Sequence, residues 1–348
     1  MRRMTKTAAL LTAAAFALTS CGGNDEGGNG GGGGDDGGPT SDVKVGMAYD
    51  VGGRGDQSFN DAAAKGMDDA AEEFGMETQE SEAADGEPES AREERLRTFA
   101  EAGFDPIVAV GFAYSASVAK VAAEYPEVHF AIIDDEAAAA DNIANLVFAE
   151  EQGSFLVGAA AALKTEADHI GFVGGVETPL IKKFEAGYVA GAKAVTPNIK
   201  VDITYLTQPP DFSGFGDPAK GKTAAQGMYD GGADIVYQAA GGSGGGVFEA
   251  ATEAKMKAIG VDSDQYETAD ASVKEVIMTS MLKRVDVAVL EYLTEVDGGN
   301  FPSGVERYDL AVDGVGYSTS GGFVDDITGD LDEFKQQIID GEITVPTE

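Results

Sequence analysis

From residue 43 onward, short runs of apolar, β-favouring residues alternate with longer stretches in which apolar residues recur at helical spacing. The apolar runs predict strands at 43–50, 76–81, 106–112, 129–134, 170–176, 201–206, 234–240, 258–262, 276–282 and 308–312. The periodic stretches predict helices at 58–74, 90–102, 115–124, 153–164, 182–195, 222–230, 245–257 and 284–296. Such an alternation is typical of right-handed βαβ units and parallel sheets.

The alternating region is long enough for two lobes instead of one core. The sequence divides it into a first lobe of residues 42–148 and about 263–312, and a second lobe of residues 149–262 and about 313–348. The chain would then cross between the lobes in three segments that together form a hinge. Ligands of parallel sheets bind beyond the carboxyl ends of the strands, so polar residues at strand ends are the candidates for a binding site.

The first 20 residues have the composition of a secretory signal, with a basic start, an apolar run at 8–17 and small residues before Cys21. The ending Leu18-Thr19-Ser20-Cys21 resembles a bacterial lipobox, so Cys21 is expected to carry lipid and to become the mature N-terminus. The apolar run is about half the ~20 residues that span a bilayer. Residues 21–41 are expected to form a disordered, glycine-rich tether. The protein is therefore expected to be exported and anchored at the outer face of the cell membrane, or on the periplasmic side in a diderm.

The composition argues against several classes of function. Asp and Glu number 61 against 24 Lys and Arg, which gives a formal net charge of −37. No basic run remains after the signal to follow a phosphate backbone, so nucleic-acid binding is not expected. Cys21 is the only cysteine, and the only histidines are His129 and His169, so no cluster has the spacing of metal ligands. We therefore expect neither enzyme activity nor a cofactor.

The first predicted strand ends in Asp50 and leads into a glycine-rich loop, Val51-Gly52-Gly53-Arg54-Gly55-Asp56-Gln57, which is followed by Ser58-Phe59-Asn60. Glycine permits a tight turn and leaves room for a ligand. Ser58, three residues before Asp61, is expected to cap the next helix. Phe59 can present its ring at the strand-end crevice, although by itself the pattern also fits an ordinary βα turn with a core phenylalanine.

Further motifs follow this loop in order along the chain: Gly111-Phe112, Phe130-Ala131-Ile132-Ile133-Asp134, Phe215-Gly216-Asp217-Pro218-Ala219-Lys220-Gly221-Lys222, Ala240-Gly241-Gly242-Ser243-Gly244, Ile259-Gly260-Val261-Asp262-Ser263-Asp264-Gln265 and Thr279-Ser280-Met281-Leu282-Lys283-Arg284-Val285-Asp286. Together with the pattern Asp-x-Gly-Gly-x-x-Asp-x-Ser-Phe-Asn that begins at Asp50, they resemble the basic membrane protein (Bmp/PnrA-like) family of ABC-transporter substrate-binding lipoproteins. The resemblance covers essentially the whole region after the tether.

The resemblance implies an α/β fold of the type I periplasmic-binding class, in which two parallel-sheet lobes are joined by a three-segment hinge. It also implies a receptor for purine nucleosides (adenosine, guanosine or inosine). Such a receptor would deliver its ligand to an ABC permease and the associated ATPase, and we expect it to be a monomer.

The resemblance further implies roles for individual residues. The base would be sandwiched between Phe59 of the first lobe and Phe215 of the second. The first-lobe polar positions around the base match Asp50, Asn60 and Asp134. The positions that hold the ribose and line the cleft match Gly242, Asp262 and Lys283. Two assignments stay open, because Phe212 is a rival for Phe215 and Asp264 lies close enough to be confused with Asp262.

Two other motifs favour different functions. Residues 216–223 match the Walker A pattern, but a Pro-Pro turn separates them from the preceding strand and Pro218 lacks an N–H, so ATP binding is not expected. Arg54-Gly55-Asp56 spells an adhesion tripeptide. The alternatives that stay open are a sugar or signalling molecule as the ligand of the same fold, an exported nucleoside hydrolase, and an adhesin that exposes residues 54–56.

Overall fold

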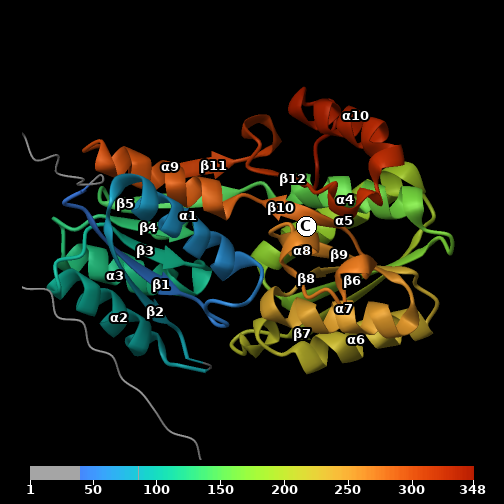
Figure 1. Ribbon diagram of the computed structural model, residues 1–348, viewed down its shortest axis with the longest axis horizontal. Helices are drawn as coiled ribbons and strands as arrows, with labels where there is room; N and C mark the ends of the chain where they lie inside the picture. The colour runs from blue at the N-terminus through green and yellow to red at the C-terminus, as the bar shows by residue number, and fades with distance from the viewer. Residues whose placement is uncertain (1–39, 85) are drawn as a thin grey trace, which may run out of the picture. The chain divides into compact units, whose positions relative to one another are not determined.

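A computed structural model describes residues 40–84 and 86–348, which form two α/β halves, each built on its own sheet (Figure 1). The predicted signal sequence, Cys21 and most of the predicted tether lie outside the described residues. Each sheet has six strands, and helices cover both of its faces. This is the type I periplasmic-binding fold.

The first sheet has the strand order β11-β5-β4-β3-β1-β2, and all of its strand pairs are parallel. Its strands are β1 (Lys44–Tyr49), β2 (Glu77–Glu82), β3 (Ile107–Val110), β4 (Phe130–Ile133), β5 (Ile143–Phe148) and β11 (Gly304–Tyr308). Its helices are α1 (Phe59–Phe74), α2 (Glu89–Glu101), α3 (Ser115–Glu124) and α9 (Val285–Asp297). Helices α1 and α9 pack together, as do α2 and α3.

The second sheet has the order β12-β10-β9-β8-β6-β7, with β12 antiparallel to β10 and the other pairs parallel. Its strands are β6 (His169–Val176), β7 (Lys200–Thr207), β8 (Ile235–Ala239), β9 (Lys257–Asp262), β10 (Ile277–Lys283) and β12 (Val315–Tyr317). Its helices are α4 (Glu150–Lys164), α5 (Pro179–Val195), α6 (Pro218–Asp230), α7 (Gly244–Ala254), α8 (Gln265–Thr268) and α10 (Thr328–Ile339). Short 3-10 helices are η1 (Phe112–Tyr114), η2 (Ser213–Phe215), η3 (Gly241–Ser243), η4 (Lys274–Val276), η5 (Leu310–Val312), η6 (Ser320–Gly322) and η7 (Asp325–Ile327).

The inner strands are buried along almost their whole length because both faces of each sheet are covered. In β4, Ala131 and Ile133 pack into one apolar cluster, whereas Phe130 and Ile132 pack into another on the opposite face. All four side chains are fully buried. Continuous apolar runs therefore predict these strands well, and the exposed edge strand β2 is recognised by its position between two helices.

The chain passes between the sheets after β5, after β10 and after β11. From the sequence, residues from about 263 to 312 are predicted to belong to the first lobe, but β10 pairs with β9 in the second sheet. The second crossing therefore comes only at Arg284, between β10 and α9. The pattern of apolar residues marks β10 as a strand, but it does not say which sheet the strand joins.

Other differences from the predicted elements have local causes. Strand β5 is missed because Asn145 interrupts its short apolar run; its buried amide donates to the carbonyl groups of Asp135 and Ala138. The strand predicted at 308–312 instead ends at Tyr308, and residues 310–312 form η5. Strand β12 and the helices α8 and α10 are not predicted either.

Candidate ligand-binding site

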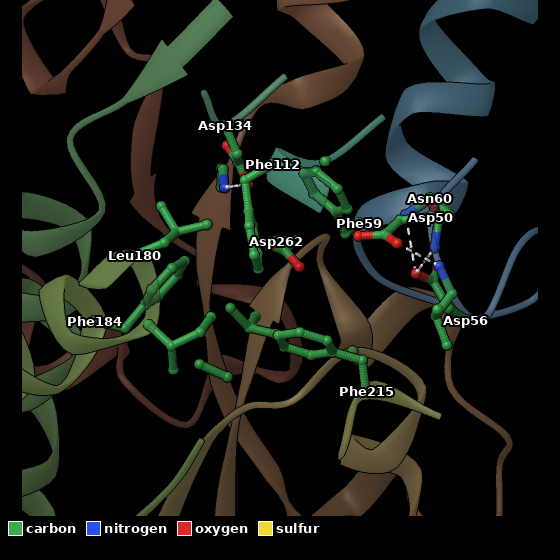
Figure 2. Close-up of a pocket in the computed structure, with 17 residues that line it drawn as sticks. Asp50, Asp56, Phe59, Asn60, Phe112, Asp134, Leu180, Phe184, Phe215 and Asp262 are labelled. Atoms are coloured by element: carbon green, nitrogen blue, oxygen red, sulfur yellow. Dashed lines mark hydrogen bonds and ion pairs between the residues drawn. The ribbon is translucent and has the colours of Figure 1, made fainter. Parts of the chain in front are cut away.

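A pocket lies at the carboxyl ends of strands from both sheets, where the loops of the two lobes meet (Figure 2). The cavity itself measures about 60 Å³, and the pocket together with its open mouth holds about 570 Å³ of empty space. Its walls mix aromatic rings, aliphatic side chains and carboxylates. The lining residues are Asp50, Val51, Asp56, Phe59, Asn60, Gly111, Phe112, Asp134, Leu180, Ile181, Phe184, Phe215, Ala239, Gly241, Val261, Asp262 and Lys283.

The loop between β1 and α1 is organised by Asp56, which is buried. Its Oδ1 accepts from the backbone N–H groups of Ser58 and Asp61, at 2.9 and 3.1 Å, and its Oδ2 accepts from the N–H of Asn60 at 2.9 Å. These bonds satisfy the free N–H groups that begin a helix. The prediction that Ser58 caps α1 is therefore wrong, because Asp56 takes that role and the Ser58 hydroxyl makes no capping bond.

Ser58 instead forms part of a contact between the lobes. Its hydroxyl donates to Asp262 Oδ2 across the cleft at 2.6 Å, and its carbonyl accepts from the Ser263 hydroxyl at 3.2 Å. Beside it, Gln265 Nε2 donates to the carbonyl of Gln57 at 2.9 Å. Residues 57–58 and 262–265 are called the interlobe latch below. These bonds form with protein groups alone, so the lobes meet directly beside the pocket.

Two phenylalanine rings line the pocket from opposite lobes, Phe59 at the start of α1 and Phe215 at the end of η2. Figure 2 shows them on two sides of the pocket, with the Asp262 carboxylate between them in this view. The Phe215 ring rests on Gly175 at the end of β6, where any Cβ would overlap it. Phe212 does not line the pocket, and its ring packs edge-on against Phe112 at 5.9 Å between centroids.

A buried ammonium group stands at one end of the pocket. Lys283 Nζ lies 2.5 Å from Asp134 Oδ2 and 3.3 Å from Glu150 Oε1, and the lysine side chain is 1 % exposed. Burial by itself lowers the pKa of Lys283, but the carboxylates of Asp134, Glu150 and Asp262 raise it above its usual value. The lysine is therefore charged, and its ammonium group is paired with carboxylates of the protein.

Several carboxyl groups of the pocket resist ionisation because they are buried. Burial raises the pKa of Asp50 and of Asp56 to about 6, although hydrogen bonds from backbone N–H groups oppose the shift in both. Burial also raises the pKa of Asp134 to about 7, against the opposing charge of Lys283, and it raises the pKa of Asp262. The pocket thus gathers groups whose protonation changes near neutral pH.

Two residues that line the pocket each carry an oxygen without a hydrogen-bond partner among the described residues. Asn60 Oδ1 and Asp134 Oδ1 are buried and have no hydrogen-bond partner within the described part of the chain. The amide nitrogen of Asn60 is held by Asp56 Oδ2 at 3.1 Å, which turns the oxygen of the amide to the other side. Buried polar atoms are normally paired. These two acceptors are therefore suited to donors of a ligand.

The backbone is left-handed at three non-glycine residues around the cleft: Gln57 with φ 54°, Asp134 with φ 66° and Asp262 with φ 62°. Non-glycine residues adopt this conformation at some energetic cost, and such residues cluster at functional sites. Asp134 and Asp262 directly follow or end their strands, so the conformation turns both carboxylates towards the crevice.

A profile of the family described as ABC transporter substrate-binding protein PnrA-like matches residues 43–348. This chain belongs to the Bmp/PnrA-like family of ABC transporter substrate-binding proteins. The family description gives the chain a solute-binding role in an ABC transporter.

Individual relatives cover nearly the same region. The chain is 35% identical over 327 residues to the CD4+ T-cell-stimulating antigen of Listeria monocytogenes, covering 88% of this chain and 89% of the relative. It is 33% identical over 328 residues to the ABC transporter nucleoside-binding protein BmpA of Lactococcus lactis, covering 88% and 90%. A crystal structure of an ABC transporter solute-binding protein from Aeropyrum pernix is similar with a TM-score of 0.76 at 31% identity, covering 88% of this chain and 94% of that chain.

In this Bmp-family protein, the structure brings almost all of the predicted site residues to one pocket: Asp50, Phe59, Asn60, Asp134, Phe215, Asp262 and Lys283. Gly242 is the exception, because its neighbour Gly241 lines the pocket in its place. Asp264 is directed elsewhere, since its Oδ2 accepts from the hydroxyls of Ser318 and Ser320.

Helix α5 contributes an apolar wall to the pocket that was not predicted from the sequence. Leu180, Ile181 and Phe184 come from the first turns of this helix, which begins with the cap Thr178 and with Pro179. The signal was available in principle, because a helix that starts at a strand end points its first turn at the crevice. Helical spacing alone, however, does not separate core residues from pocket residues.

Side chains of the Walker-like segment 216–223 and of the adhesion-like tripeptide 54–56 form ion pairs and hydrogen bonds within the protein. Lys222 of the Walker-like segment pairs with Glu249 and Glu253 on the protein surface, and the Asp217 carboxylate caps α6. In the adhesion-like tripeptide, Arg54 pairs with neighbouring acidic side chains and Asp56 is buried. Within residues 40–84 and 86–348, no cluster of acidic, His or Cys side chains could hold a metal ion, and no helix is long and apolar enough to cross a membrane.

Proposed function

We propose that this protein captures purine nucleosides in the pocket between its lobes and delivers them to an ABC permease. The observation that carries the proposal is the pair of rings, Phe59 and Phe215, which line one pocket from opposite lobes. A flat heterocycle that enters between the lobes offers one face to each ring. Closure of the lobes would then complete the site around it.

The energy of such a complex is within reach of the contacts available. Stacking of a base on an aromatic ring contributes ~1–3 kcal/mol for each contact. A micromolar complex requires about 8 kcal/mol in total. Two rings, the apolar wall of α5 and a few hydrogen bonds can supply that amount without any pairing of charges between protein and ligand.

The polar groups of the pocket favour a neutral ligand that is rich in donors. Asn60 Oδ1 and Asp134 Oδ1 are free acceptors, and the carboxylates of Asp50 and Asp262 lie in the same lining. The amino groups of a purine and the hydroxyls of a ribose are donors of this kind. Among the described residues that line the pocket, Lys283 is the one cation, and it already faces protein carboxylates. A phosphate would meet several negative charges, so nucleosides are favoured over nucleotides.

Two findings on relatives agree with this proposal. The relative from Lactococcus lactis is named a nucleoside-binding protein of an ABC transporter. Relatives from Pyrococcus abyssi and Pyrococcus furiosus are named lipoproteins. The lipobox-like sequence that ends at Cys21 leads us to propose the same attachment here, with the receptor anchored by lipid on the outer face of the membrane.

The test is calorimetry of the chain from Thr40 onward with adenosine, guanosine, inosine and, separately, ribose. We expect binding of at least one nucleoside and none of its 5′-monophosphate. A folded protein that binds ribose but no nucleoside would contradict the proposal and favour a sugar receptor. A parallel incubation with guanosine, analysed for free base, tests for hydrolysis.

Variants of the two rings test the stacking assignment. Phe59→Ala and Phe215→Ala should each weaken nucleoside binding about tenfold or more, because each removes one stacking face. Phe301, which stacks on His129 away from the pocket, provides the control Phe301→Ala. If Phe212→Ala weakens binding and Phe215→Ala does not, the second ring has been assigned wrongly.

A further inference from the structure

Glu150 does not line the pocket, yet it reaches the pocket-lining residue Lys283. It is the first residue of α4, directly after the first crossing between the lobes, and it is 1 % exposed. Its Oε1 lies 3.3 Å from Lys283 Nζ, and its Oε2 lies 3.6 Å from Lys183 Nζ of α5. Because a buried carboxylate costs free energy unless it is paired, its position requires an explanation.

Glu150, Lys283 and Asp134 together join three parts of the molecule. Lys283 ends β10 at the second crossing, and Asp134 follows β4 of the first lobe. The ammonium group contacts Asp134 Oδ2 at 2.5 Å, whereas Asp134 Oδ1 has no hydrogen-bond partner among the described residues, and Asp134 lines the pocket. The three side chains are nearly inaccessible to solvent. A change at Glu150 therefore acts on the pocket residue Asp134 through the cation that the two carboxylates share.

The charges in this cluster are not balanced. Asp134, Glu150 and Asp262 all act on Lys283, so three carboxylates from β4, α4 and β9 surround one buried cation. Lys183 of α5 is the other cation close to Glu150, and its side chain is partly exposed. Like charges in a buried site disfavour one another's ionised form. The charge on Glu150 therefore opposes the ionisation of Asp134.

We propose that Glu150 is a positioning residue of the ligand site, which fixes Lys283 between the two crossings and sets the charge state of Asp134. This inference rests on the proposed function, because its readout is nucleoside binding. Glu150 touches no ligand in this scheme. It acts by holding the ammonium group against Asp134 Oδ2, so that Asp134 Oδ1 alone is offered to a donor of the nucleoside.

The charge of Asp134 determines how nucleoside binding changes with pH. An ionised Asp134 accepts a stronger, charge-assisted hydrogen bond than a protonated one. Binding should therefore weaken as the pH falls through the pKa of Asp134, which burial and, to a smaller extent, the charge of Glu150 raise to about 7 against the opposing charge of Lys283. Removing the charge of Glu150 lowers the pKa of Asp134. The pH at which binding is half lost then moves to a lower value.

The experiment measures nucleoside affinity by calorimetry between about pH 5.5 and about pH 8 for the wild type and for Glu150→Gln. We expect the midpoint of the pH profile to fall by about one pH unit in the variant. Removing the unit charge of Glu150 from the neighbourhood of Asp134, in a partly polar interior, lowers the pKa of Asp134 by about that amount. One unit below the wild-type midpoint, the variant should bind several-fold more tightly than the wild type. A purely structural defect would weaken binding at every pH.

The matched control is Glu151→Gln, one residue further along α4. Glu151 is also buried and also paired, but its partner is Arg307 of β11 at 2.7 Å, and it does not contact Lys283. Its midpoint should stay at the wild-type value. An equal shift in both variants, or no shift in Glu150→Gln, would overturn the proposal.

A second variant, Lys183→Gln, tests the same effect if Glu150→Gln does not fold. Lys183→Gln removes the partly exposed cation beside Glu150 and should move the midpoint in the opposite direction, to higher pH, by a smaller amount. An unchanged or lowered midpoint would refute the proposal. If no nucleoside binds to the folded wild type at any pH, the proposed function itself fails, which is a distinct result from binding with unmoved midpoints.

Discussion

Replacing Ser58 with alanine removes a buried hydrogen bond between the lobes without altering the lining of the pocket. The Ser58 hydroxyl is fully buried and donates to Asp262 Oδ2 at 2.6 Å, over a sequence separation of 204 residues. The substitution deletes one oxygen atom. It leaves the capping of α1 in place, because Asp56 provides that capping.

The size of the effect follows from the type of bond. A hydrogen bond to a charged group contributes about 1.5–3 kcal/mol. At about 1.4 kcal/mol for each factor of ten, its loss shifts the equilibrium between closed and open lobes roughly 10- to 150-fold towards the open form. The apparent affinity for ligand falls with the population of the closed, binding-competent form. We therefore expect nucleoside affinity to fall about tenfold or more in Ser58→Ala.

Two measurements check this expectation. Calorimetry gives the affinity, and small-angle X-ray scattering without and with ligand gives the distribution between extended and closed forms. The matched control is Ser117→Ala, because Ser117 of α3 is also fully buried, but its hydroxyl has no hydrogen-bond partner among the described residues. This control should keep both the affinity and the scattering profile of the wild type.

The reasoning about the interlobe latch would be refuted by a folded Ser58→Ala protein with unchanged affinity and an unchanged distribution of forms. A rise in the dissociation constant without any change in scattering would also count against it. In that case the hydroxyl would act on the charge of Asp262, whose pKa the Ser58 hydrogen bond lowers, and not on closure.

Three further predictions concern the pocket and the stability of the protein. Gly175→Ala should weaken nucleoside binding at least about tenfold by calorimetry, because the new methyl group displaces the ring of Phe215. The control is Gly227→Ala, in an exposed helical position with open space around it, which should leave binding unchanged. Phe184→Ala should lower the thermal midpoint as well as the affinity, since this buried ring packs in the core and lines the pocket, and unfolding stability should fall by ~3–5 kcal/mol. The pKa of Asp50 is about 6 in the folded protein and lower in the unfolded chain, so its ionisation destabilises the fold as the pH rises from about 4 to about 7. In urea titrations, the free energy of unfolding of Asp50→Asn should therefore increase relative to that of the wild type over this range. If the free energies of the two proteins change with pH in parallel, the raised pKa of Asp50 is contradicted.

The parallel sheets and the lobes follow from the sequence because strand and helix patterns differ in period and because the inner strands are apolar on both faces. The sheet that each strand joins does not follow in the same way. Strand β10 and strand β11 are consecutive along the chain, yet they belong to different sheets. Apolar residues occur in both strands, and only the pairing of β10 with β9 shows that β10 belongs to the second sheet.

Placement at the pocket was predictable for residues that follow the end of their own strand. Phe59 and Asp134 directly follow predicted strands or their loops, and parallel strands bring their carboxyl ends to one edge. Phe184 was not predictable, because its spacing within α5 suits a core residue equally well. Glu150 was not predictable either, since a carboxylate at the start of a helix is a common surface feature.

The sequence by itself determined the class of the protein: alternating elements, an acidic composition that argues against nucleic-acid binding, and a series of strand-end motifs in a fixed order. Only the tertiary structure decided how polar groups choose their partners. Ser58 could have capped its own helix, but Asp56 satisfies those N–H groups and leaves the hydroxyl to Asp262 of the other lobe. Local competition for hydrogen bonds is visible in the sequence, whereas its outcome depends on groups that folding brings from far along the chain.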